Sequence, residues 1–103
     1  MLTTAGSREE AERLAHVLVE GGLAACVNLV PGLTSIYRWQ GAVESADELL
    51  LLIKTTTARV ESVEAALRAA HSYEVPEFVV LTTESASAAY LEWLRQATAL
   101  PRP

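Results

Sequence analysis

The sequence lacks the features that mark several common kinds of protein. It holds a single cysteine, Cys26, so no disulfide can form within the chain, and we expect a reducing, cytoplasmic environment. Eight basic residues stand against thirteen acidic ones, and the net charge is −5. Nucleic acid is therefore not an expected partner, since phosphate backbones attract basic surfaces. No apolar run is long enough to span a bilayer, and the first residues do not resemble a signal peptide.

Sequence signatures of catalysis are also missing. There is no recognisable Ser-His-Asp or Cys-His arrangement and no glycine-rich nucleotide loop. Arg8 and Asn28 could imitate the phosphate-binding pair of acylphosphatases, which share the fold class expected below. However, Glu9 and Glu10 follow Arg8 directly and would repel a phosphate. We therefore expect a protein that is not an enzyme.

What the chain has in excess is apolar residues. Half of its 103 residues are hydrophobic and only 20% are charged. A chain of this length forms one domain, here residues 1–103, and buries only about two-thirds of its unfolded surface. Part of the apolar surplus must therefore be covered by something outside the domain core.

Hydrophobic periodicity and turn residues predict alternating strands and helices. Ser7 and Glu10 form a capping box at the start of a helix that Gly21 and Gly22 end. The dipeptide at 31–32 predicts a turn or kink, and that at 40–41 begins a hairpin loop. The first predicted strand ends near residue 5, and further strands cover 23–30, 33–39, 48–57 and 77–83. The predicted helices cover 8–20, the stretch between 57 and 71, and 88–97, and the hairpin loop covers 40–47.

This order, β-α-β-β-α-β and then a helix, is that of an α+β ferredoxin-like fold with an additional C-terminal helix. Its first two helices cover one face of the sheet, so a strand such as 48–57 should alternate apolar and polar residues. Residues 49–53 are instead apolar throughout, and 78–81 behave likewise. The last helix, with Tyr90, Leu94 and Ala97 expected inward, is too short to cover a whole face. We therefore expect a homo-oligomer.

The stretch 71–77 is the first candidate site. It places an imidazole, a phenol and two carboxylates within seven residues, and His71, Tyr73 and Glu74 are its candidate ligands. One interpretation is a metal or small-ligand site at a subunit boundary. The other is a helix end where His71 complements the helix dipole and Tyr73 packs. Cys26 is likewise either a soft copper ligand or a small core residue.

Two further candidates lie in predicted strands. Tyr37 and Trp39, on either side of Arg38, form either an aromatic wall of a cleft or packing against another subunit. Lys54, the only lysine, follows five apolar residues. It is either an anion-binding or pKa-tuned amine, or a strand-end charge that pairs with Glu48 or Glu74.

Several stretches together resemble the CutA1 divalent-cation-tolerance family: residues 23–28, 31–39, 52–56, 73–77 and 90–94. The resemblance covers about residues 3–98. It implies a ferredoxin-like subunit in a tight homotrimer built by edge-strand pairing, similar in architecture to the PII signalling proteins. In some bacterial members the proposed copper ligands are a first-strand cysteine and two adjacent histidines. The matching positions here are Thr3, Ala70 and His71, so only one ligand is retained, and Ser72 stands where the family usually has proline. The first strand is short, which suggests that the natural chain starts earlier.

We therefore expect a cytoplasmic homotrimer that binds a divalent metal ion, with copper suspected, or a small ligand in clefts between subunits, and that has no nucleic-acid or membrane partner. The expected metal ligands are His71, Glu74 and Cys26. The expected cleft residues are Lys54, Tyr37, Trp39 and Tyr73. One alternative is a PII-like sensor of an anionic metabolite that uses Lys54 and Arg38. The other is a structural trimer without a ligand.

Overall fold

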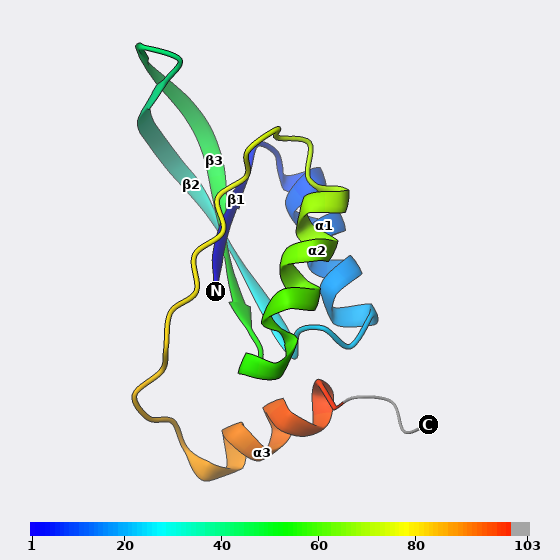
Figure 1. Ribbon diagram of the computed structural model, residues 1–103. Coiled ribbons are helices and arrows are strands. Elements are labelled where there is room, and N and C mark those ends of the chain that lie inside the picture. The colour runs from blue at the N-terminus through cyan, green and yellow to red at the C-terminus, as the bar shows by residue number, and fades with distance from the viewer. Residues whose placement is uncertain (100–103) are drawn as a thin grey trace.

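An antiparallel sheet in the order β1-β3-β2 organises the computed structural model, which describes residues 1–99 (Figure 1). Its strands are β1 (Leu2–Ala5), β2 (Cys26–Trp39) and β3 (Ala42–Lys54). The helices are α1 (Arg8–Glu20), α2 (Val60–Ala70), which a 3-10 turn (Thr57–Arg59) precedes, and α3 (Ala88–Ala97). The predicted α+β class and the positions of all three helices are confirmed.

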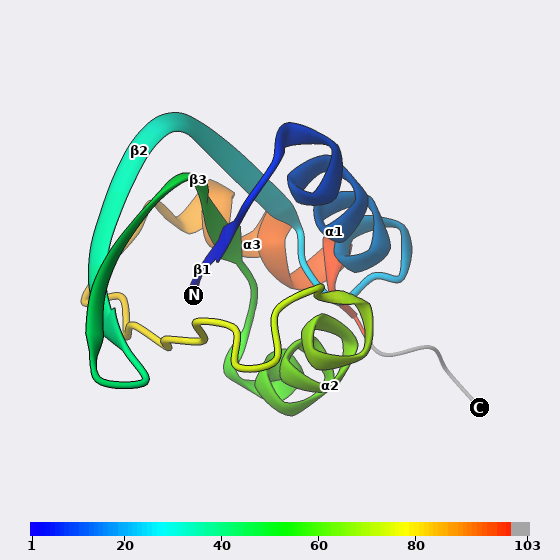
Figure 2. The ribbon, with the colours of Figure 1, turned by 90° about the horizontal axis from the view of Figure 1, so that it is seen from above.

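Helices α1 and α2 lie side by side on one face of the sheet (Figures 1 and 2). The predicted cap of α1 is present, because the Ser7 hydroxyl accepts from the Glu10 N–H at 3.1 Å. Leu49, Leu51 and Ile53 of β3 are buried beneath the helices, at every second position as the two-residue period of a strand requires. The core between the layers contains Ala5, Ala11, Leu14, Leu18, Ala24, Leu49, Leu51, Ile53, Val63 and Leu67.

The β2–β3 hairpin projects well beyond the helices (Figure 1). Its ladder shifts register between Val30 and Leu33, where Gly32 takes a φ of 82°, so the predicted turn is a bulge within one long strand. A two-residue turn with positive φ at Gln40 and Gly41 joins the strands. The predicted hairpin loop at 40–47 is therefore wrong. The polar residues of this stretch instead pair with β2 in a ladder, and solvent contacts both faces of that ladder.

The predicted strand at 77–83 is reduced to a single bridge. Val79 and Leu2 exchange two backbone hydrogen bonds of 2.8 and 3.1 Å, which places this segment against the outer side of β1. The bridge gives the strand order of the ferredoxin-like fold, with the fourth strand beside the first. No other strand of residues 1–99 pairs with the outer side of this segment, and Val79, Val80 and Leu81 are exposed. Within residues 1–99, the pairing of this segment with β1 is limited to that one residue pair.

The second face of the sheet stays largely uncovered, as the apolar character of 49–53 predicted. Leu50 and Leu52 on this face are only half-buried. Helix α3 lies at the lower end of the molecule, apart from α1 and α2 (Figure 1). Only Leu94 of α3 is buried, so the expectation that Tyr90 and Ala97 also face inward is wrong within one chain.

A buried arginine attaches α3 to the rest of the molecule. Arg59 donates from Nε to the Thr98 carbonyl at 2.9 Å and from its guanidinium to the Ala99 carbonyl at 3.0 Å. Carbonyls at a helix C-terminus lack partners within the helix, and a guanidinium is well suited to bind them.

None of the helices within residues 1–99 has the length and apolar character that crossing a bilayer requires.

Thr3 offers a test of the core. Its side chain is 0% exposed, and its hydroxyl is the one buried side-chain polar atom of residues 1–99 without a hydrogen-bond partner. We expect Thr3→Val to raise the free energy of unfolding by about 1 kcal/mol, because an isosteric methyl removes an uncompensated desolvation cost. Denaturant unfolding followed by circular dichroism measures this.

Thr55→Val is the matched control, since the Thr55 hydroxyl donates to the Leu23 carbonyl at 2.7 Å. This control should lower the free energy of unfolding. Destabilisation by Thr3→Val similar to that of the control would show that the Thr3 hydroxyl is satisfied in solution.

Candidate functional site

A cleft of about 790 Å³ lies between the hairpin and the loop that follows α2. Its volume is within the range of small-molecule sites. Aromatic and acidic side chains dominate its lining, and no Lys, Arg or His contributes to it within residues 1–99. The lining consists of Thr4, Ser35, Ile36, Tyr37, Trp39, Glu44, Glu48, Tyr73, Glu74, Val75, Pro76 and Glu77.

The hairpin ladder determines which side chains share the cleft. Tyr37 pairs with Glu44 across the strands, and Ser35 pairs with Ala46 two positions along. Alternate residues of a strand point to the same face, and paired residues share that face. This row of β2 therefore lies beside the row of β3 that contains Glu44 and Glu48. Desolvation raises the pKa of Tyr37, and the charge of Glu44 and a hydrogen bond to it raise that pKa further.

Glu48 is a buried carboxylate at one end of the cleft. Its side chain is 8% exposed, and its Oε2 accepts from the Tyr73 hydroxyl at 2.8 Å. No ion pair within residues 1–99 involves Glu48. Desolvation, and then the hydrogen bond and charge of Glu48, raise the pKa of Tyr73 to about 12, so its hydroxyl remains a donor at neutral pH. A buried charge is normally paired with an opposite charge, and a neutral phenol offsets its desolvation only in part.

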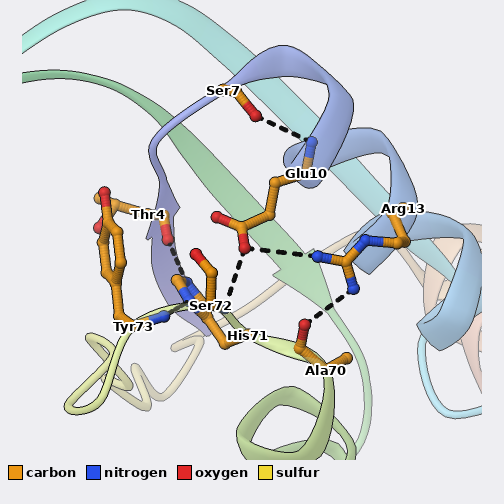
Figure 3. A network of polar contacts seen from close by, with 8 residues as sticks. All are labelled: Thr4, Ser7, Glu10, Arg13, Ala70, His71, Ser72 and Tyr73. Carbon is orange, nitrogen blue, oxygen red and sulfur yellow. Dashed lines mark hydrogen bonds and ion pairs between the residues drawn. The ribbon is translucent and has the colours of Figure 1, made fainter.

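His71 lies behind the cleft wall rather than in it. Its Nε2 donates to the Thr4 carbonyl at 2.7 Å, and its Nδ1 accepts from the Tyr73 N–H at 3.1 Å (Figure 3). The ring is 9% exposed and packs against the Tyr73 ring with a centroid distance of 4.6 Å. Both nitrogens of this predicted ligand are therefore occupied, and binding a metal would break one of these bonds.

A second buried carboxylate, Glu10, holds the loop against α1. Its Oε2 accepts from the Ser72 N–H at 2.9 Å and from Arg13 at 3.4 Å, and Arg13 also donates to the Ala70 carbonyl at 2.8 Å (Figure 3). Desolvation raises the pKa of Glu10, but hydrogen bonds from Ser72, the electrostatic effect of the nearby His71 and a hydrogen bond from the Gly6 backbone together lower it overall. The loop is thus positioned from both α1 and β1.

The structure does not bring Lys54 and Cys26 to this cleft. The two residues pair with each other across the ladder, whereas Thr4 pairs with Leu50. At 3.3 Å per residue, four residues along β3 separate them from the loop by roughly 13 Å. Lys54 donates to the Asn28 side chain rather than to Glu48 or Glu74.

The expected cleft residues Tyr37, Trp39 and Tyr73 do line one cleft, and Glu74, expected as a metal ligand, lines it with them. Within residues 1–99, no three His, Cys, Asp or Glu side chains are arranged to hold a metal ion. Sequence reasoning missed Glu44 and Glu48 as wall residues. The signal appears only if 42–48 is taken as a strand. Glu44 then pairs with Tyr37, and Glu48 lies four residues further along the same face.

Comparison with known proteins agrees with this architecture. The family model described as CutA1 divalent ion tolerance protein matches residues 1–97. The divalent-cation tolerance protein CutA of Thermus thermophilus is 52% identical, with 95% of each chain covered, and its solved structure superposes with a TM-score of 0.93. The structure of the PII-like protein CutA from Nostoc sp. PCC 7120 has 37% identity and a TM-score of 0.89, and the match covers 97% of this chain and 96% of that one.

A relative from Arabidopsis thaliana, named as chloroplastic, is 44% identical over 92% of this chain. This chain spans 52% of that relative's length, whereas it spans nearly all of the Thermus protein.

The Glu10 contacts predict a pH-dependent contribution to stability. Because the folded-state pKa of Glu10 is lowered, its ionised form stabilises the fold above the unfolded-state pKa of about 4.3, and this contribution is lost as pH falls through the folded-state value. We expect Glu10→Gln to lower the free energy of unfolding by roughly 1–3 kcal/mol near neutral pH. The deficit should shrink below about pH 4.

Urea unfolding of wild type and variant across this pH range measures the effect. Glu9→Gln, in the same helical turn but exposed, is the control and should follow wild type. A deficit that is constant with pH would mean that Glu10 acts through packing rather than through its charge.

Proposed function

Since this chain belongs to the CutA1 divalent ion tolerance protein family, we propose that it is a non-enzymatic protein of divalent-cation tolerance that binds a cation in clefts between the subunits of a homotrimer. The observation that supports this most directly is the cleft wall. Four glutamates line it, no basic side chain of residues 1–99 does, and Glu48 is buried there without an ion-pair partner. Such a wall attracts cations and disfavours anions.

The homotrimer is supported by the surface that one chain leaves uncovered. The outer edge of β2 is fourteen residues long and pairs with no other strand of residues 1–99. Apolar side chains of the hairpin are exposed, with Ile36 at 73% and Val43 at 65%. A long apolar edge of this kind favours pairing with another chain. Assembly through this edge would place the hairpin, and with it the cleft, at a subunit boundary.

The metal and its ligands are part of the proposal. Glu74 and Glu48 lie in the cleft, so we propose these carboxylates as the first ligands, which suit hard cations. Copper, the metal suspected from the sequence, would require a nitrogen or sulfur ligand. His71 could supply one after releasing Thr4 or Tyr73, and Cys26 only from another subunit.

The alternative of an anionic-metabolite sensor has less support, because Lys54 lies outside the cleft and Arg38 is not part of its lining. A structural trimer without a ligand has less support from the cleft, whose acidic lining includes no basic side chain of residues 1–99. The cytoplasmic location is proposed from the single cysteine.

Calorimetric titration of Cu²⁺ and of Mn²⁺ into chelator-stripped protein tests the cation site. We expect saturable binding that Glu48→Gln and Glu74→Gln weaken by about tenfold or more, at least the loss typical for outer-shell partners of a metal. Glu61→Gln, an exposed position outside the cleft, is the matched control and should bind as wild type does.

If Glu61→Gln weakened binding equally, the binding would come from general surface charge, and the proposed site would be rejected. Loss of Cu²⁺ binding in His71→Ala alone, with both cleft variants unaffected, would replace the carboxylate site with one centred on His71. Light scattering on the same samples measures the mass, and a monomer would overturn the proposed assembly.

A further inference from the structure

The cleft is larger than a metal ion alone would fill, and part of its wall is apolar. Its volume of about 790 Å³ is that of a small-molecule site, and Val75 and Pro76 contribute apolar surface to its walls. We propose that this cleft accommodates a linear organic polycation, an alkyl chain with two or more ammonium groups. The inference rests on the proposed function in one respect, namely that the cleft is a cation site.

The aromatic side chains support an organic cation. Tyr37 and Trp39 are 40% and 39% exposed, and Tyr73 adjoins Glu48 in the same cleft. Aromatic faces attract ammonium groups and their adjoining methylenes, and tryptophan does so most strongly. A hydrated divalent ion pairs with carboxylates equally well but gains little from an apolar wall.

The carboxylates are spaced for more than one positive charge. Glu44 and Glu48 lie four residues apart on the same face of β3, roughly 13 Å along the strand. Ala46 and its partner Ser35, which carry no charge, lie between them. A single ammonium or metal ion can neutralise only one of these carboxylates. An alkyl polyamine can place a charge near each and its methylenes along the small side chains between them.

The buried end of the cleft favours an ammonium donor. The Glu48 carboxylate accepts from the Tyr73 hydroxyl, and no other protein donor to it is found within residues 1–99. A primary ammonium supplies both the opposite charge and N–H donors for the remaining lone pairs. Glu74 and Glu77 on the loop side of the cleft add negative charge against which further ammonium groups can bind.

Tryptophan fluorescence provides a direct readout. The chain has two tryptophans, and Trp93 of α3 is not part of the cleft, so in Trp93→Phe the emission comes from Trp39 alone. We expect spermidine, added to this metal-free variant at physiological salt, to change that emission saturably. In calorimetry on the wild-type background, Glu48→Gln should weaken spermidine binding by about tenfold or more, as loss of one partner of a buried charge pair does.

The aromatic contribution is tested by Trp39→Ala, which should weaken spermidine binding by roughly three- to thirtyfold, with partial recovery in Trp39→Phe. Glu61→Gln, outside the cleft, should bind as wild type does. Circular dichroism of each variant establishes that it is folded.

The outcomes separate this inference from the proposed function. Metal binding that depends on Glu48, with no spermidine binding, would overturn the polycation inference and leave the cation site in place. Spermidine binding that Mg²⁺ of equal charge concentration abolishes, and that Trp39→Ala does not weaken, would also overturn it, since charge alone would then suffice. Absence of binding by either kind of cation would reject both.

Discussion

The pairing of β2 with β3 is the interaction on which the rest of the structure depends. β3 is the central strand: it carries the buried leucines under α1 and α2, pairs with β1 on one side and extends with β2 beyond the helices. A ladder of this length has a fixed register, because a slip by one residue would turn the buried row outward. The same register that buries Leu49 and Leu51 therefore also aligns Glu44 with Tyr37 and places both in the cleft.

The loop after α2 depends on contacts of a different kind. Backbone atoms of 71–73 are held by the Glu10 carboxylate and the His71 ring rather than by a strand ladder. The arrangement is tight, since a Cβ at Gly6 would lie 2.9 Å from the Tyr73 hydroxyl oxygen. The residues that resemble a metal site in the sequence thus position Tyr73, and Tyr73 in turn contacts the carboxylate that faces the cleft.

Local signals in the sequence were sufficient for the helices and the fold class. The capping residue Ser7, the spacing of Leu14 and Leu18, and the apolar character of 49–53 each depend on short-range physics or on a simple two-face rule, and the structure agrees with them. The hairpin was mispredicted because polar residues such as Glu44 and Asp47 are typical of loops, whereas here the ladder with β2 keeps them extended. Turn chemistry at Gln40 and Gly41 was the better guide.

The site was predictable only where sequence neighbours remain spatial neighbours. Tyr73 and Glu74 lie in one loop, and Tyr37 and Trp39 in one strand, so their proximity within each pair follows from the chain. Whether Lys54 or Cys26 joins them depends on strand register, which composition does not specify. The sequence predicted only one of the two contacts of Glu10. Its backbone N–H donates to the predicted Ser7 cap, but its carboxylate also binds a loop more than sixty residues away, which the sequence did not indicate.

The contacts that run from Glu48 through Tyr73 and His71 to Thr4 connect the cleft to β1, the strand against which Val79 forms its single bridge. These contacts would link occupancy of the proposed cation site to order at that outer edge of the sheet. Linkage is reciprocal, so a bound cation that holds Tyr73 in place favours the ordered edge, and a neighbour that orders the edge strengthens binding by the same factor. In the proposed homotrimer, this series of four residues would make the affinity of one cleft a property of the assembly rather than of a single chain.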